Sequence, residues 1–182
     1  MGGGPSVVVL AASGDAEQVG PAGAGRDGAV RRKLESRARA WASSVAAGRV
    51  QVTAPDRLEA AARSALGDGP VLIAWPCLAR WLPEHAEGAL GDLAAGCDVS
   101  IGPVFSGGLY LLAIARPRAE LLALTRPPDL GPDAFGTALD AVQRSGLAVG
   151  LLRAERGLRT VSDVRAALAD PLLDDEMRTL LS

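Results

Sequence analysis

The chain has 182 residues, 48% of them hydrophobic and 22% charged, which suits one domain with a sizeable core. Its formal net charge of −2 gives no electrostatic case for a nucleic-acid partner or an anionic membrane surface. No apolar run approaches the ~20 residues of a membrane-spanning helix, and the N-terminus lacks the pattern of a signal peptide. Two cysteines, Cys77 and Cys97, do not make a disulfide framework, so we expect a cytoplasmic protein with reduced thiols.

Short apolar runs alternate with stretches of helical periodicity along the chain. Residues 1–5 are Gly-rich and expected to be disordered, and 13–27 are expected to form a long loop. The predicted strands are 6–12, 49–53, 71–75, 97–101, 109–114 and 147–152. The predicted helices are 28–47, 56–66, one from residue 82 onward, 117–124, 133–145 and 161–168. An acidic, Leu-rich segment at 170–182 is expected to be a tail or a last helix. This alternation predicts an α/β fold.

The expected directions of the strands in the sheet follow from the stretch 71–114. Its first two apolar runs are separated by a helix, which makes a βαβ unit with parallel strands. The turn at Gly107-Gly108 is too short for a crossover, so the strand 109–114 is expected to be antiparallel. Ligands of open α/β sheets bind beyond the carboxyl ends of the strands. A site is therefore expected at 75–77 and 102–108.

Two segments of this stretch resemble motifs of a known family. Val71–His85 is similar to an apolar strand followed by Gly-Ser-Asp-x-Pro and, after a spacer, Pro-Glu-His. Asp98–Leu112 is similar to Asp-Val-x-x-Gly-Pro-x-x-Asp-Gly-Gly-Tyr-Tyr-Leu. Both patterns are typical of bacterial glycosyltransferase-A-like nucleotide-diphospho-sugar transferases, relatives of the guanylyltransferases of molybdenum-cofactor and phospholactate (deazaflavin-cofactor) chemistry. The resemblance implies a single three-layer αβα domain spanning 1–182, with a mostly parallel sheet.

The acidic positions of that family are not retained. Where the family has an acid that looks like a metal ligand, this chain has Cys77, and a thiol is a poor ligand for magnesium or manganese. The next acidic position is occupied by Ser106. In 157–164, which is similar to Asp-x-Asp-x-x-x-Asp-Leu, only Asp163 keeps a carboxylate and Arg159 replaces another. The comparison with the family motifs therefore implies that no metal is bound and that no divalent cofactor is needed.

The resemblance also assigns binding positions. Gly28–Leu34 is similar to Gly-x-x-Lys-Thr-Arg-Leu, whose basic residues are expected to meet phosphates at a helix start. The implied nucleotide-binding residues are Ala12, Ser13, Arg31, Lys33 and Cys77. The implied acceptor-side residues are Ser106, Gly107, Gly108, Tyr110 and Arg159.

Ordinary structural roles stay open for several of these residues. The cluster Arg31–Lys33 could be a solvated helix surface, and Cys77 could be a small core residue rather than a nucleophile. His85, the single histidine, is expected at a surface position rather than as a general base. Trp75 and Trp81 could stack on a base, although packing in a core or an interface is the more frequent role.

Three functions are compatible with these observations. The first is a transferase-like protein with a degenerate metal and acceptor site that binds a nucleotide or nucleotide-sugar weakly or not at all. The second is an active, metal-independent transferase in which Arg31, Lys33 and Arg159 supply the charge of the cation. The third is a non-enzymatic interaction protein, such as a homodimer formed through Trp75, Trp81 or the Leu-rich tail.

Overall fold

The computed structural model describes residues 4–11, 27–46, 49–65, 69–116, 118–124 and 133–182. The expected loop 13–27 lies outside the described residues except for its last residue. The strands are β1 Ser6–Leu10, β2 Val50–Thr53, β3 Val71–Ala74, β4 Val99–Pro103, β5 Leu109–Ile114 and β6 Val149–Leu151. The helices are α1 Asp27–Ala46, η1 Pro55–Arg57, α2 Leu58–Ala65, α3 Pro83–Ala94, α4 Ala119–Ala123, α5 Ala134–Arg144, α6 Val161–Leu168 and α7 Asp175–Leu181. Each predicted strand and helix is therefore confirmed to within a few residues, and the Leu-rich tail contains a last helix.

One boundary differs from the prediction. The strand expected to stop at Ile101 continues through Gly102 to Pro103 as β4. Its register against β5 shifts between Gly102 and Pro103, so the proline lies at an irregular strand end. Proline lacks a donor for the strand ladder and is tolerated at such a place.

The six strands form one sheet in the order β2-β1-β3-β5-β4-β6. Strand β1 pairs in parallel with β2 and β3, and β4 pairs in parallel with β6. Strand β5 lies between β3 and β4 and is antiparallel to both. The single antiparallel strand expected from the short Gly107-Gly108 turn is therefore confirmed.

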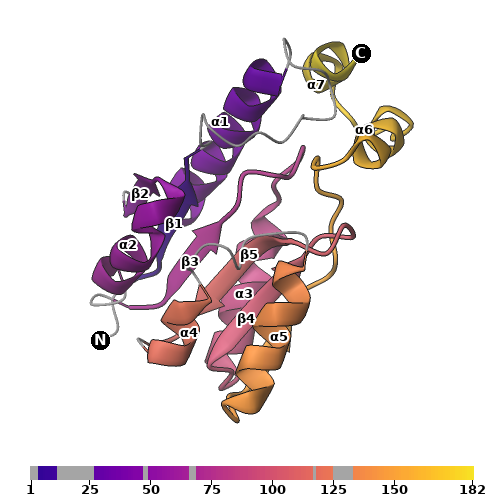
Figure 1. Ribbon diagram of the computed structural model, residues 1–182. Helices are drawn as coiled ribbons and strands as arrows, with labels where there is room; N and C mark the ends of the chain where they lie inside the picture. The colour runs from indigo at the N-terminus through magenta and orange to yellow at the C-terminus, as the bar shows by residue number, and fades with distance from the viewer. Residues whose placement is uncertain (1–3, 12–26, 47–48, 66–68, 117, 125–132) are drawn as a thin grey trace.

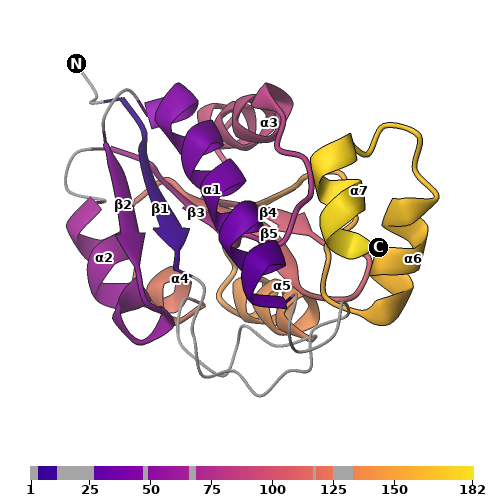
Figure 2. The ribbon, with the colours of Figure 1, turned by 90° about the horizontal axis from the view of Figure 1, so that it is seen from above.

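Helices cover both faces of the sheet. Figure 2 shows α1 and α3 on one side and α2, α4 and α5 on the other. Alternate residues of β1 supply the two cores: Val7 and Val9 pack under α1, and Val8 and Leu10 pack under α2. All five residues of β1 are buried, as expected for a strand covered on both faces. The expected three-layer αβα architecture is confirmed. No helix in the described part of the chain is both long and apolar enough to cross a membrane.

A third apolar cluster joins α6 and α7 to the first half of α1. Val30 and Leu34 of α1 pack in one cluster with Val164 of α6 and Met177 of α7. Figure 1 shows α7 beside the first turns of α1, although the two are far apart in sequence (Figure 1). The C-terminal helices thus lie beside the carboxyl ends of the central strands, where the site is expected.

Candidate functional site

The turn between β4 and β5 has the hydrogen bonds of a three-residue hairpin loop. The Gly107 N–H donates to the Val104 carbonyl at 2.9 Å, and the Val104 N–H donates to the Gly108 carbonyl at 2.9 Å. Gly107 has a φ of +89°, a left-handed conformation that glycine adopts at little cost. Phe105 and Ser106 therefore lie at the tip of this turn, at the carboxyl end of β4.

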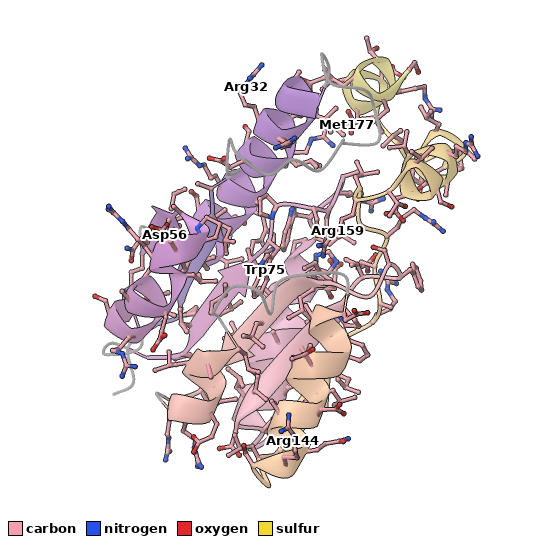
Figure 3. The ribbon with its side chains drawn as sticks, in the orientation of Figure 1. Arg32, Asp56, Trp75, Arg144, Arg159 and Met177 are labelled. Atoms are coloured by element: carbon pink, nitrogen blue, oxygen red, sulfur yellow. The ribbon has the colours of Figure 1, made fainter. Side chains whose placement is uncertain are left out.

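The segment Glu155–Arg159, which precedes α6, is tied between this turn and the end of β3. The Phe105 N–H donates to the Glu155 carbonyl at 3.0 Å on one side. On the other side the Leu158 N–H donates to the Cys77 carbonyl at 2.7 Å. These backbone bonds bring Arg159 to the carboxyl edge of the sheet, where Figure 3 labels it (Figure 3).

Arg159 packs directly on the backbone of the turn. A Cβ atom added to Gly108 would lie only 1.7 Å from Arg159 Nη1 and 2.9 Å from its Cζ. The charge of Arg159 also acts on the Cys77 thiol, so the guanidinium lies near both the turn and the end of β3. The structure therefore brings together three predicted positions: Cys77, Gly108 and Arg159.

Asp163, the one retained acid of the C-terminal motif, has a structural role. Its Oδ2 accepts hydrogen bonds from the Arg159 N–H at 3.1 Å and the Thr160 N–H at 2.9 Å. The Asp163 N–H in turn donates to Thr160 Oγ1 at 3.1 Å, so Thr160 caps the start of α6. These bonds orient the segment that carries Arg159.

The described donor groups at this edge do not fit a divalent metal ion. Burial raises the pKa of the Cys77 thiol to about 12, with the charge of Arg159 opposing the effect, so the thiol is protonated at neutral pH. Asp163 already uses one oxygen for two backbone amides. Within the described residues no group of three or more His, Cys, Asp or Glu side chains could hold a metal. Magnesium and manganese prefer hard oxygen ligands, and the described residues of this edge do not gather a set of them.

Two buried polar atoms near this edge lack partners among the described residues: Trp75 Nε1, directly after β3, and Ser106 Oγ in the hairpin turn. A buried donor without a partner costs roughly 1–3 kcal/mol. Trp75 itself packs in the apolar core under α2, α4 and α5, which is the more frequent role anticipated for it.

Two other predicted binding residues, Lys33 and Tyr110, have structural partners of their own. Lys33 forms an ion pair with Glu176 of α7 at 2.5 Å. Tyr110 is buried in the core on the α1 and α3 side of the sheet, so the structure does not bring its side chain to Arg159. Ala12 and Ser13 lie outside the described residues. Arg31 lies on α1 and is half-buried.

The surroundings of Tyr110 form an aromatic cluster that includes His85. The ring centroids of Trp41 and Trp81 are 4.4 Å apart, and those of His85 and Tyr110 are 5.1 Å apart. The Tyr110 hydroxyl donates to the Arg153 carbonyl at 3.3 Å. The expected surface position of His85 is wrong, since only 5% of this residue is exposed.

His85 is inside because it completes the start of α3. Its Nδ1 accepts from the Leu82 N–H at 3.3 Å, so the proton of the neutral ring lies on Nε2, which is 3.4 Å from Glu155 Oε1. Pro83 and His85 occupy the first and third positions of the helix. A side chain at the third position commonly bonds back to the residue before the helix, and this local pattern could have revealed the buried role.

We predict a pH-dependent stability from His85. Burial lowers the pKa of its imidazole, with Glu155 opposing the shift. The His85 imidazole is therefore protonated at a higher pH in the unfolded chain than in the folded chain. Its contribution to the free energy of unfolding is fully present above about pH 6.5 and decreases as the pH falls below that value. Denaturant unfolding at pH 7.5 and pH 5.0 should show a larger loss for the wild type than for His85→Gln. Equal losses in both proteins would contradict the prediction.

No protein-family model matches the sequence, and no curated protein is significantly similar to it. The fold is that of a nucleotide-diphospho-sugar transferase, which confirms the structural relationship that the resemblance implied. The chain is similar to the crystal structure of a protein from Desulfovibrio desulfuricans G20 assigned as such a transferase. The identity is 15% and the TM-score 0.68, over 97% of this chain and 93% of the other.

The chain is also similar to Rv0371c from Mycobacterium tuberculosis H37Rv. The identity is 16% and the TM-score 0.53, over 93% of this chain and 100% of Rv0371c. A structure of Rv0371c in complex with manganese gives 17% identity and a TM-score of 0.51 over the same shares. At sequence identities this low, the structural similarity establishes the fold alone.

Proposed function

We propose that this chain is a transferase-like protein of the glycosyltransferase-A type that binds a nucleotide or nucleotide-sugar without a metal ion. One observation carries the proposal: the Arg159 guanidinium lies against Gly108 and beside Cys77, at the carboxyl edge of the sheet. Ligands of open α/β sheets bind at this edge. A guanidinium can bond two phosphate oxygens at once, which suits a diphosphate.

The chemistry of the groups around Arg159 supports ligand binding without a metal ion. Rv0371c has been crystallised with manganese. In this chain the described groups around Arg159 at the carboxyl edge of the sheet include a protonated thiol and a carboxylate occupied by backbone amides. A fixed cation would repel a metal ion and attract a phosphate. Because one arginine supplies less charge than a divalent ion, we expect modest affinity.

The test is a thermal-shift panel of nucleoside diphosphates and nucleotide-sugars, with EDTA and with magnesium or manganese. A ligand at about 100 times its Kd adds about 2.7 kcal/mol, a shift of roughly 5–10 °C for a domain of this size. We expect at least one ligand to raise Tm in EDTA, with little further gain from metal. A shift that requires metal would contradict the proposal, and the absence of any shift would favour an interaction protein.

Two variants should show that Arg159 is the phosphate-binding group. Arg159→Ala is expected to weaken the identified ligand by about tenfold or more, the value of a charged hydrogen bond. Gly108→Ala leaves Arg159 in the chain but forces its guanidinium away from the turn. Titration calorimetry should show both effects, whereas Arg165→Ala, an exposed arginine on α6, should bind normally. Unchanged affinity in Arg159→Ala would contradict the assignment.

A metal-independent transferase is the second candidate, and the position of Arg159 also favours it. In such an enzyme a cation stabilises the negative charge that develops on the leaving diphosphate. The test is release of nucleoside diphosphate from the identified nucleotide-sugar in EDTA, with a panel of hydroxyl acceptors. Activity that disappears in Arg159→Ala would support the enzyme. Binding without release would support the degenerate site.

Of the residues named from sequence for a homodimer, Trp75, Leu173 and Leu181 are buried within the chain. Trp81 is half-buried and Leu172 is 70% exposed, so such an interface would have to use residues like these two. The cytoplasmic location and the lack of nucleic-acid and membrane partners stay predictions from composition.

A further inference from the structure

A cavity of about 410 Å³ lies beside the segment Glu155–Arg159. Its walls come from the chain after β3, the segment before α6, and the loop between α6 and α7. The volume falls within the range of about 300–1,000 Å³ that is usual for small-molecule sites. Neither Cys77, Gly108 nor Arg159 lines it, so it is distinct from the proposed nucleotide site.

The floor of the cavity is aliphatic. Leu78, Leu158 and Leu173 line it and are almost completely buried. Leu172 also lines it, yet 70% of this residue is exposed. Covering exposed apolar surface contributes roughly 25 cal/mol per Å², so an aliphatic group in the cavity would be stabilised by Leu172 and the floor together.

The rim of the cavity is cationic, although the whole chain has a net charge of −2. It carries Arg80, Arg153 and Arg156 against two carboxylates, Glu155 and Asp170. Arg153 is paired with Glu155 at 2.6 Å. Arg80 and Arg156 have no carboxylate partner among the described residues. Two guanidinium groups are therefore available to an anion.

Arg156 is held in place by an aromatic ring, and Asp170 by the backbone. The Arg156 guanidinium carbon lies 5.7 Å from the centroid of the Phe105 ring, an arrangement typical of a cation–π contact. Asp170 Oδ1 accepts a hydrogen bond from the Leu172 N–H at 2.9 Å. This bond partly balances the negative charge of the Asp170 carboxylate. The rim thus presents a positive charge above an aliphatic floor.

We propose that this cavity binds a small amphiphilic anion, with a short aliphatic chain on the leucine floor and a carboxylate or phosphate head between Arg80 and Arg156. The ligand is separate from the nucleotide proposed above, and neither proposal depends on the other. The two sites share one wall, because Leu158 lines the cavity and Arg159, the next residue, lies over Gly108.

The test uses hexanoate and hexyl phosphate as probes, with hexanol and inorganic phosphate as controls that lack the anion or the chain. Each is titrated into the ¹⁵N-labelled protein below its aggregation concentration, and amide shifts are followed by NMR. We expect saturable amide shifts around Leu158 and Leu172 with at least one of the two anionic probes. The probe with the lower Kd shows whether the cavity prefers a carboxylate or a phosphate head group. No shifts in this region, or equal binding of hexanol, would overturn the proposal.

Variants locate the interaction. Arg80→Ala and Arg156→Ala should each weaken binding of the probe by about tenfold. Leu172→Asp should abolish binding, because it places a negative charge where the aliphatic chain would pack. These side chains are exposed, so the variants should fold, which their amide spectra would show. Arg165→Ala, an exposed arginine outside the cavity, is the matched control. Wild-type affinity in the Arg80→Ala, Arg156→Ala double variant would overturn the assignment.

Discussion

Replacing Tyr110 by alanine should lower the free energy of unfolding by about 3–5 kcal/mol, the usual cost of removing a buried aromatic side chain. Only 1% of Tyr110 is exposed, and its ring packs against Trp81 and His85 in the centre of the domain. The neighbouring rings are large and cannot collapse into the space that the substitution leaves. Urea unfolding monitored by circular dichroism measures the effect.

Tyr110→Phe separates packing from hydrogen bonding. This variant keeps the ring and loses only the 3.3 Å bond to the Arg153 carbonyl, so we expect a cost of about 1 kcal/mol. Phe105→Ala removes an aromatic ring that is 67% exposed and should cost about 0.5 kcal/mol or less. If Tyr110→Ala were no more destabilising than Tyr110→Phe, the ring would not be a core element.

Arg37→Ala should cost about 2–3 kcal/mol, because it removes the hydrogen bonds that tie α1 to the start of α7. The guanidinium makes two bonds to the Asp174 carboxylate, at 2.7 and 2.8 Å, and a third to the Ala79 carbonyl at 2.5 Å. Its side chain is only 21% exposed, so these bonds are partly shielded from water. Charged hydrogen bonds of this kind contribute roughly 1.5–3 kcal/mol in total when partly buried.

Arg39→Ala is the matched control, since Arg39 lies on the same helix and is half exposed. Its partner is Glu35, one turn away, and such a pair contributes about 0.3–0.5 kcal/mol. Hydrogen exchange should show α7 opening more often in Arg37→Ala than in Arg39→Ala. Equal protection of α7 amides in the two variants would show that the Arg37 bonds are not needed to hold this helix.

The cost of Arg37→Ala should also depend on pH. The bonds to Arg37 hold the pKa of Asp174 well below its usual range. A depressed carboxyl pKa contributes stability that is present above about pH 4 and is lost as the pH falls further. Asp174 is 49% exposed, so solvent screening reduces this contribution. The difference between wild type and Arg37→Ala should therefore be largest near neutral pH and shrink in acid.

The fold could be predicted from the sequence because its signals are local. Short apolar runs bounded by Gly and Pro mark strands buried on both faces, and 3.6-residue periodicity marks the helices. The short Gly107-Gly108 turn allows only an antiparallel neighbour, which determined the direction of β5. Helical periodicity over 161–168 likewise predicted α6, whose start is capped by Thr160 in the structure. Each of these inferences needs only residues close together in the chain.

The site could be predicted only in part. The order of motifs placed Cys77, Ser106 and Gly108 at the carboxyl edge of the sheet, where the structure has them. No local pattern indicates that Arg159 rests on Gly108, because that contact depends on backbone bonds between the segment before α6 and the end of β3. Trp75 and Ser106 likewise became candidate donors only when their burial and missing partners were known.

The sequence by itself determined the order and type of the elements, the mostly parallel sheet and the edge where a ligand should bind. Tertiary structure alone decided which side chains reach that edge. Neighbouring residues of a strand point to opposite faces of the sheet, so the sequence predicts that Leu109 and Tyr110 lie on different faces. Because helices cover both faces, the sequence does not indicate which face each side chain joins. A charged helix face does not reveal whether its residues are solvated or paired, and Lys33 pairs with Glu176 far along the chain. Such choices depend on burial and on partners distant in sequence, which local patterns do not contain.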